Sequence, residues 1–212
     1  MALTVMLKVE GRRCLVVGGG KVGVRKARGL HDEGAEVIIL SSSLAEQLPG
    51  VQFIQGRYTA QYLVDLHPWL VVAATDDPIV NKQIEADARA ANILTMLVDN
   101  PAAGDVRGII TREDEHITVA VSSGSPRLSR YLADRLHGSI RPEMREFAGW
   151  MRALRPHVRA GIDQQSDRAD LWKQIFDSGV IHHVENGDLV SARRELAAIL
   201  GTDLAQHVPE VS

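Results

Sequence analysis

Three glycines have the spacing that dinucleotide-binding proteins use to hold a pyrophosphate. The segment CLVVGGGKVGVRKARGL contains Gly18, Gly20 and Gly23 directly after a β-rich run and at the start of a helical stretch. In that context the first glycine permits a tight turn, the second lets the backbone approach the phosphates, and the third lets the helix pack close to the strand. The phosphates would lie at the helix N-terminus, where free N–H groups and the dipole favour negative charge. We expect a dinucleotide site here, with a ligand-free tight turn as the alternative.

The end of the second β-rich run bears on which dinucleotide is bound. An NAD site usually places Asp or Glu there, whereas this run, AEVIIL, is followed by Ser41, Ser42 and Ser43. Serine hydroxyls can bond a ribose or a phosphate, so they are compatible with NAD and with NADP. Arg25 and Lys26, one turn into the helix, could hold a 2′-phosphate or simply face solvent. We predict NAD as the cofactor.

Polar side chains also follow three other apolar runs, where each predicted strand ends. They are Thr75, Asp76 and Asp77, then Asp99 and Asn100, then Ser122 and Ser123. In a doubly wound sheet, ligands bind in the crevice outside the carboxyl ends of the strands, so we expect these groups at the site. Thr75 and Asp76 are candidate cofactor contacts, although the two aspartates also fit a loop turn and a helix N-cap.

Asp99 is the strongest candidate for chemistry, because it closes the apolar run ILTMLV. We expect its carboxyl group to enter the crevice partly desolvated, where it can serve as an acid, a base or a metal ligand. No Ser-His-acid or Cys-His arrangement stands out beside it, and the eight histidines include no pair spaced for zinc on one helix face. Asp99 is therefore the candidate functional carboxylate, and no residue is assigned to a resident metal.

The elements that must position these groups alternate along the first 123 residues. Strands are expected over six β-rich runs, 13–19, 35–40, 51–56, 70–75, 93–99 and 116–123. Helices are expected between them at 21–33, 59–66 and 78–91. Continuous apolar runs are typical of strands buried on both faces, and strand–helix alternation favours a mainly parallel sheet with right-handed crossovers. The predicted fold class is α/β, with a Rossmann-type doubly wound sheet.

After Gly124 the pattern becomes helical. An amphipathic helix is expected to open at Ser125-Pro126, a second to span 141–160, and two more to lie near 169–178 and 187–200. Gly179 and Gly201 are expected to end helices. The predicted division is a nucleotide-binding domain over 1–123, a helical region over 124–160 and a small helical C-terminal domain over 161–212.

Composition excludes several classes of protein. The 24 basic and 27 acidic residues are too evenly balanced for a dedicated nucleic-acid binder. No apolar run reaches the roughly 18 residues of a membrane span, and the N-terminus MALTVMLKVEGRR lacks the pattern of a signal peptide. The single cysteine, Cys14, cannot form an internal disulfide. We expect a soluble cytoplasmic protein that binds neither nucleic acid nor membrane.

Several segments together resemble a known family. GGGKVGVRKARGL, AATDDPIVN, LVDN and VAVSSGSPRLSRYLADRL, and later LWKQIFDSG and SARRELAAIL, are similar to the precorrin-2 dehydrogenase/sirohydrochlorin ferrochelatase family. That family is the N-terminal module of siroheme synthase together with its stand-alone relatives. The resemblance covers nearly the whole chain. Because the sequence ends soon after Leu200, we expect the stand-alone form, without the methyltransferase module of the fused enzymes.

The resemblance implies an activity and a partner. The family oxidises precorrin-2 to sirohydrochlorin with NAD as hydride acceptor, and many members then insert ferrous iron as a second substrate. Its members are homodimers, which implies that 124–160 is a dimerisation region. The tetrapyrrole is implied to lie in a cleft near the nicotinamide.

The resemblance also assigns residues. The family's essential aspartate matches Asp99 in Leu97-Val98-Asp99, and the serine of its Val-Ser-Ser-Gly loop, which faces the tetrapyrrole, matches Ser123. Its nucleotide contacts match four residues, Lys21, Val22, Ser42 and Ser43. Asp99 is expected to accept the proton released as hydride leaves. Carboxylates of the substrate are expected to pair with basic residues near the cleft, namely Arg107, Arg127 and Arg130.

The chain departs from the family around the implied tetrapyrrole pocket. An apolar Phe-x-x-Pro stretch usually follows the aspartate, whereas PAAGDVRGIITRED places Asp105 and Arg107 there. The Ser-Ser-Gly loop is also two residues shorter before Ser125-Pro126. Two alternatives therefore stand beside the dehydrogenase: a catalytically altered NAD-binding regulatory module, and a relative that only inserts metal into another tetrapyrrole.

Overall fold

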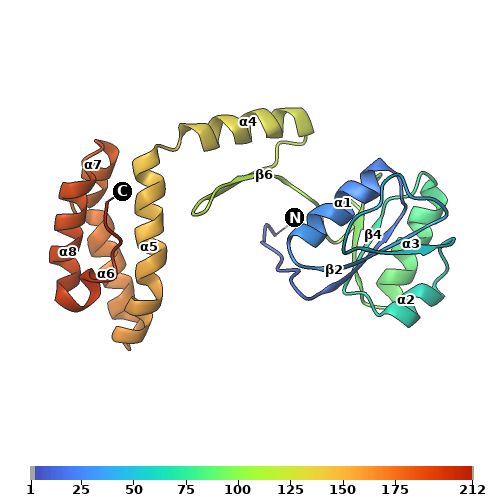
Figure 1. Cartoon of the computed structure of the whole chain (residues 1–212), viewed down its shortest axis with the longest axis horizontal. Helices are drawn as coiled ribbons and strands as arrows, with labels where there is room; N and C mark the ends of the chain where they lie inside the picture. Colours follow the sequence, from blue (N-terminus) through green and yellow to red (C-terminus); the bar gives the residue numbers. More distant parts are fainter. Residues whose placement is uncertain (1–2, 212) are drawn as a thin grey trace. The chain divides into compact units, whose positions relative to one another are not determined.

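The computed structural model describes residues 3–211, which form two compact units (Figure 1). The first unit ends at Gly108 and the second begins at Ile109. This division precedes the boundary expected after residue 123, because the segment between the two positions packs on the helix that follows it. Each unit is described separately.

The first unit is built on a five-stranded parallel sheet. Its strands are β1 (Arg13–Val17), β2 (Glu36–Ser41), β3 (Gln52–Gln55), β4 (Leu70–Ala73) and β5 (Leu94–Leu97). They lie in the order β3-β2-β1-β4-β5, and every neighbouring pair is parallel. The chain runs outward from β1 in one direction and then restarts beside β1 in the other. The predicted doubly wound sheet is confirmed, and ligands of such sheets bind where the order reverses, between β1 and β4.

Both faces of this sheet are buried under helices, as the continuous apolar strands predict. Helix α1 (Lys21–Asp32) packs on one face against alternate strand residues such as Val16 and Val72. Helices α2 (Gln61–Leu66) and α3 (Pro78–Ala90) pack on the other face, against residues such as Leu15 and Val71. Cys14 is fully buried on the α1 side, and burial raises the pKa of its thiol to about 11.

The second unit opens with a β-hairpin that the sequence analysis placed elsewhere. Strands β6 (Ile110–Glu113) and β7 (Thr118–Val121) pair antiparallel in a sheet of their own. The prediction of a sixth strand of the parallel sheet at 116–123 is therefore wrong. This strand leaves the parallel sheet because the segment before it forms β6, which was not predicted, and pairs with it across a short polar turn. Both strands contact α4 (Pro126–Ser139), which opens at Ser125-Pro126 as predicted and whose N-cap Ser125 accepts from the N–H of Leu128.

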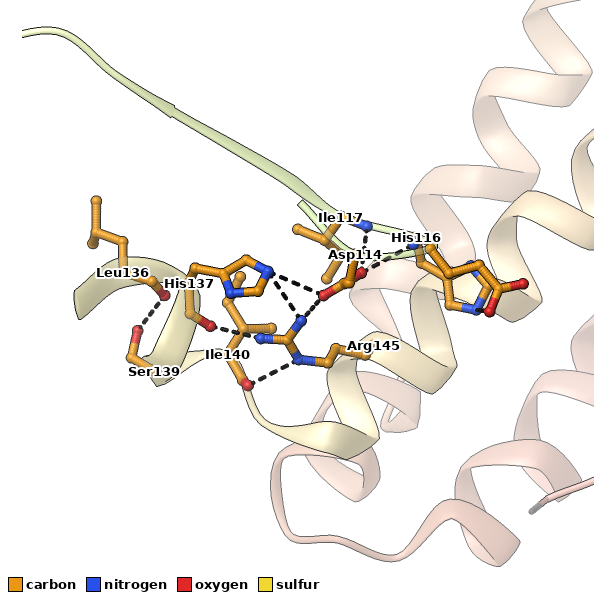
Figure 2. Close-up of polar contacts among 9 residues, drawn as sticks. Asp114, His116, Ile117, Leu136, His137, Ser139, Ile140 and Arg145 are labelled. Carbon is orange, nitrogen blue, oxygen red and sulfur yellow. Dashed lines mark hydrogen bonds and ion pairs between the residues drawn. The ribbon is translucent and has the colours of Figure 1, made fainter. Parts of the chain in front are cut away.

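A polar cluster fastens the tip of this hairpin to the junction of α4 and α5 (Pro142–Gly161). The Oδ1 atom of Asp114 accepts from the N–H groups of His116 and Ile117, each at 3.0 Å, which closes the turn. Its Oδ2 atom pairs with Arg145 and lies 3.2 Å from Nε2 of His137 (Figure 2). Arg145 also donates to the carbonyl oxygens of His137 and Ile140. One partly buried charge pair thus joins three elements of the second unit.

The remainder of the second unit is a helical bundle of α5, α6 (Gln165–Asp177), α7 (Val180–Glu185) and α8 (Leu189–Ala205). Phe147, Trp150 and Leu154 on α5 form its core with apolar residues of the other helices. The short α7 is not among the predicted helices. Gly201, expected to end a helix, has a φ of +71° and breaks α8 near its end. Within residues 3–211, no helix has the length and apolar character to cross a membrane.

Candidate active site

The glycine turn after β1 has the geometry that its spacing predicts. Gly18 has a φ of +115°, and a Cβ added there would lie 2.4 Å from the carbonyl oxygen of Ala74 at the end of β4. A Cβ at Gly23 would lie 1.9 Å from the oxygen of Gly18, so α1 approaches the turn closely. A Cβ at Gly20 would meet nothing within 4 Å. The first and third glycines are thus required by packing, whereas the second faces open space.

The N-terminus of α1 points its free donors into the space beside Gly20. The first intrahelical hydrogen bond runs from the N–H of Val24 to the oxygen of Gly20, at 3.0 Å. The N–H groups of Lys21, Val22 and Gly23 precede it and have no acceptor within the helix. The first turn carries no acidic residue, and no side chain caps it. Such an end favours a bound anion.

The serines after β2 lie against this turn. A Cβ at Gly19 would lie 2.1 Å from the carbonyl oxygen of Ser43, and the N–H of Ala45 donates to the oxygen of Gly19 at 2.8 Å. Ser42 and Ser43 are exposed. The structure therefore brings the segment of Ser42 and Ser43, both predicted nucleotide contacts, next to the glycine turn.

The segment after β4 is joined to Asp99 by one buried side chain, that of Asn81 on α3. Its Oδ1 accepts from the N–H and the hydroxyl of Thr75, at 3.1 and 2.7 Å. Its Nδ2 donates to the oxygen of Thr75 at 3.1 Å and to Oδ2 of Asp99 at 3.0 Å. Gly18 packs against this same segment, so the glycine turn, Thr75, Asn81 and Asp99 form a continuous chain of contacts at one edge of the sheet.

Asp99 is exposed, which corrects the expectation of a partly desolvated carboxyl group. The reason is where the strand stops: β5 ends at Leu97, and the last ladder bond runs from the N–H of Val98 to the oxygen of Ala73. Asp99 lies beyond that bond, and its Oδ1 accepts from the N–H of Asn100 at 2.9 Å. Its position at the carboxyl edge agrees with the prediction.

The two aspartates after β4 have separate places. Asp77 caps α3 by accepting from the N–H of Ile79 at 2.8 Å, which confirms the predicted N-cap with Pro78 at the first helical position. Asp76 is exposed in the turn before it. The hydroxyl of Thr75 already bonds to Asn81 and to the backbone of Asp77, so it supports the turn from inside. Their predicted contacts with a cofactor remain predictions.

Asp105 and Arg107, which stand where the family usually has the apolar Phe-x-x-Pro stretch, have different surroundings. Asp105 folds back onto β5, where its Oδ2 accepts from the N–H and the hydroxyl of Thr95 at 3.0 and 2.8 Å. The N–H of Val106 also donates to the oxygen of Thr95. Asp105 thereby fastens the segment leaving the first unit to the edge of the sheet. Arg107, next along, is exposed.

Two of the predicted substrate contacts belong to the second unit. Ser123 follows β7, and its hydroxyl bonds to the hydroxyl of Ser129 and the oxygen of Ser125. Arg127 is exposed in the first turn of α4. Because β7 is not part of the parallel sheet, the expectation that Ser122 and Ser123 lie at the carboxyl edge of that sheet is wrong. Their role toward a substrate remains a prediction.

Sequence reasoning assigned no role to Asn81, although a signal for it exists. Asn81, Ile84 and Ala88 form the buried stripe of α3, at the spacing of one helix face. An amide on an otherwise apolar stripe must find hydrogen-bond partners inside the protein. The partner, Asp99, is 18 residues away, in the segment that follows β5, so only the folded topology identifies it. Within residues 3–211, no group of three His, Cys, Asp or Glu side chains could hold a metal ion.

Two family models match the chain in the same two regions. Residues 5–107 match the family described as "Putative NAD(P)-binding", and residues 143–200 match the "Sirohaem synthase dimerisation region". The first match contains the glycine turn and Asp99, and the second contains nearly all of α5 together with α6, α7 and most of α8. The first unit therefore carries an NAD(P)-binding domain, and the second carries a dimerisation region of this family.

Individual relatives agree with these matches. A siroheme synthase of Chromobacterium violaceum is 33% identical over 91% of this chain, and one of Tolumonas auensis is 36% identical over 83%. The chain spans only about two fifths of the length of these relatives, 42% and 38%. Among solved structures, SirC, a precorrin-2 dehydrogenase, superposes with a TM-score of 0.66 at 21% identity and covers 93% of this chain and 98% of its own. The fold is shared over essentially the whole length of both chains.

The arrangement of the elements, the glycine turn and the two matched regions agree with one another. The carboxyl edge of the parallel sheet carries the turn and Asp99, and the helical unit matches the dimerisation region. The chain belongs to the siroheme synthase family, over the part of those enzymes that carries the NAD(P)-binding region and the dimerisation region.

Proposed function

We propose that this protein oxidises precorrin-2 to sirohydrochlorin and transfers the hydride to NAD. The observation that carries the proposal is the chain of contacts from the glycine turn to Asp99. Gly18 packs on the backbone at Ala74 and Thr75, and Asn81 joins Thr75 to Asp99. A dinucleotide held at the turn and a proton acceptor at Asp99 would therefore belong to one site.

The residues around the turn fit a dinucleotide. A pyrophosphate suits this place for two reasons. The open space beside Gly20 lets it approach the backbone, and the N–H groups of Lys21, Val22 and Gly23 attract its negative charge. The hydroxyls of Ser42 and Ser43 would hold a ribose. When bound, the nicotinamide supplies a hydride acceptor.

Asp99 has the chemistry that the oxidation needs from the protein. Removal of two hydrogens from precorrin-2 sends one away as hydride and leaves one as a proton. A carboxylate beside the reacting carbon can take that proton as the hydride departs. Because Asp99 is exposed, it can then release the proton to solvent before the next turnover.

NAD rather than NADP is the cofactor that we propose. A 2′-phosphate needs a cation near the end of β2, and one of the two candidate cations there, Lys26, packs elsewhere. Its ammonium group lies against Gly108, where an added Cβ would be 3.2 Å from it, and burial lowers its pKa with a further contribution from Arg25. Cofactor preference is checked by titrating the protein with NAD and with NADP.

The substrate and the assembly complete the proposal. Precorrin-2 carries carboxylates around its ring, and the exposed guanidinium groups of Arg107, Arg127 and Arg130 are suited to pair with them. Ser123 would contact the macrocycle. The match to a dimerisation region supports a homodimer, and we place the reaction in the cytoplasm.

The experiment mixes the purified protein anaerobically with precorrin-2 and NAD and follows the tetrapyrrole and NADH spectra. Sirohydrochlorin and NADH should form in equal amounts with wild type and not with Asp99→Asn. Asp32→Asn is the matched control, because Asp32 is an exposed aspartate at the opposite end of α1. Ferrous iron is then added to the product, and faster siroheme formation than without protein would add the chelatase step. Wild type that binds NAD and leaves precorrin-2 unchanged would favour a regulatory module instead.

A further inference from the structure

Asn81 carries a buried amide, and both of its polar atoms have hydrogen-bond partners within the protein. It is 1% exposed, on the face of α3 that packs against the sheet. Its oxygen accepts two hydrogen bonds and its nitrogen donates two, to Thr75 and to Asp99. Burial of an amide is unfavourable unless its hydrogen bonds are made, so a side chain of this kind needs its partners in fixed places.

The orientation of this amide follows from chemistry. The backbone N–H of Thr75 can only donate, so the Asn81 atom that faces it must be the oxygen. The nitrogen is then the atom that faces Asp99, where a carboxylate can only accept. The two bonds are consistent with a single orientation of the amide and exclude the flipped one. Asn81 is therefore a donor to Asp99.

Asp99 has few other restraints. Its side chain is exposed, and its second oxygen bonds only to the N–H of the next residue, Asn100. Without Asn81, the carboxylate would be free to rotate out of the edge of the sheet. With it, one oxygen is tied to the turn at Thr75, against which Gly18 also packs.

We infer that Asn81 is the positioning residue of this site: it orients the carboxylate of Asp99 relative to the glycine turn. This inference rests on the proposed function, in which Asp99 takes a proton while hydride leaves for the nicotinamide. Hydride and proton leave different atoms of the same conjugated ring system in one reaction, so the carboxylate must keep a fixed position relative to the cofactor. Asn81 contacts neither substrate nor cofactor and acts through Asp99.

Two variants test the accepting oxygen and the donating nitrogen of the Asn81 amide. Asn81→Asp keeps an oxygen that can accept from Thr75 and loses the donor to Asp99, whereas Asn81→Leu loses both. We expect kcat to fall about 10- to 100-fold in each, as for other residues that orient a reacting group. We expect KM and NAD affinity to stay within about twofold of wild type, because a lost positioning contact acts on the reaction step and not on binding.

Ile84→Val is the matched control. Ile84 lies one turn further along the same buried stripe of α3, so the variant loosens the same helix without touching Asp99. It should lower the melting temperature and leave kcat unchanged. Loss of kcat in Asn81→Asp but not in Ile84→Val, at comparable melting temperatures, supports positioning. Equal kcat in the two variants, or KM and NAD affinity that weaken in step with kcat, would overturn it.

A second measurement needs neither turnover nor a folded Asn81 variant. In wild type, both side-chain amide protons of Asn81 should exchange slowly with solvent by NMR, since both are buried and bonded. In Asp99→Ala, one of the two should exchange faster, because its acceptor is gone. Unchanged exchange overturns the inference. If wild type shows this protection but no activity on precorrin-2, the proposed function fails and the hydrogen bond from Asn81 to Asp99 stands.

Discussion

The glycine turn and the Asp99 edge form two halves of the candidate site and are built in opposite ways. The turn works through missing side chains: Gly18 and Gly23 leave room for neighbouring backbone, and Gly20 leaves room for a ligand. The Asp99 edge works through side chains that are present, held in a network through Asn81. Substitutions at the turn should therefore act by steric conflict, and substitutions at the edge by loss of a chemical group.

The largest effect is expected at the Asp99 edge. Asp99→Asn should lower the rate of hydride transfer about 10²- to 10⁴-fold, the usual contribution of a positioned acid or base. NAD affinity should be unchanged, because the turn holds the dinucleotide without Asp99. Stopped-flow detection of NADH and calorimetric titration with NAD measure the two quantities. A variant with normal turnover would remove Asp99 from the mechanism.

The second-largest effect is expected at Gly20, the glycine of the turn that faces open space and not neighbouring backbone. Gly20→Val adds a side chain to open space, so the protein should fold with an unchanged melting temperature. The added methyl groups would occupy the approach of the pyrophosphate and weaken NAD binding at least tenfold, or about 1.4 kcal/mol. Calorimetric titration measures the affinity. Unaltered NAD binding would show that the dinucleotide lies elsewhere.

Gly23→Ala, in contrast to Gly20→Val, should lower the stability of the protein. Its Cβ would lie 1.9 Å from the oxygen of Gly18, so α1 must move away from the turn. We expect overpacking to lower the free energy of unfolding by about 1–3 kcal/mol. Urea denaturation measures it, with Gly20→Val as the comparison. Equal stability of the two variants would mean that the turn relaxes more easily than its packing suggests.

The smallest effect is expected at Asp77, an acidic residue at the same edge of the sheet as Asp99 whose role is only structural. Asp77→Ala removes the N-cap of α3 and should cost about 1 kcal/mol of stability, with kcat unchanged. Thermal unfolding and the turnover assay give both values. A large loss of kcat here would mean that the whole edge, and not Asp99 alone, serves the reaction.

The sequence predicts the features that depend on neighbouring residues. The glycine turn, the N-cap at Asp77 and the break at Gly201 all follow from local backbone rules, and the structure confirms them. The parallel sheet also follows, because runs such as CLVV and LVVA must be buried on both faces.

Features that depend on distant partners could not be predicted in the same way. The strand at 118–121 has a normal β pattern, but its partner at 110–113 decides that it forms a hairpin outside the parallel sheet. The exposure of Asp99 depends on where β5 stops pairing with β4. The role of Asn81 depends on its contact with Asp99 across two elements. Each of these requires knowledge of which segments lie side by side.

A crystal structure of the protein with bound NAD tests the central claim most directly, since that claim joins the two halves into one site. We predict the pyrophosphate on the N–H groups of Lys21, Val22 and Gly23, and the nicotinamide ring in contact with the carboxylate of Asp99, within about 3–4 Å. A nicotinamide ring turned away from the end of β5, or a dinucleotide bound outside the glycine turn, would contradict the account.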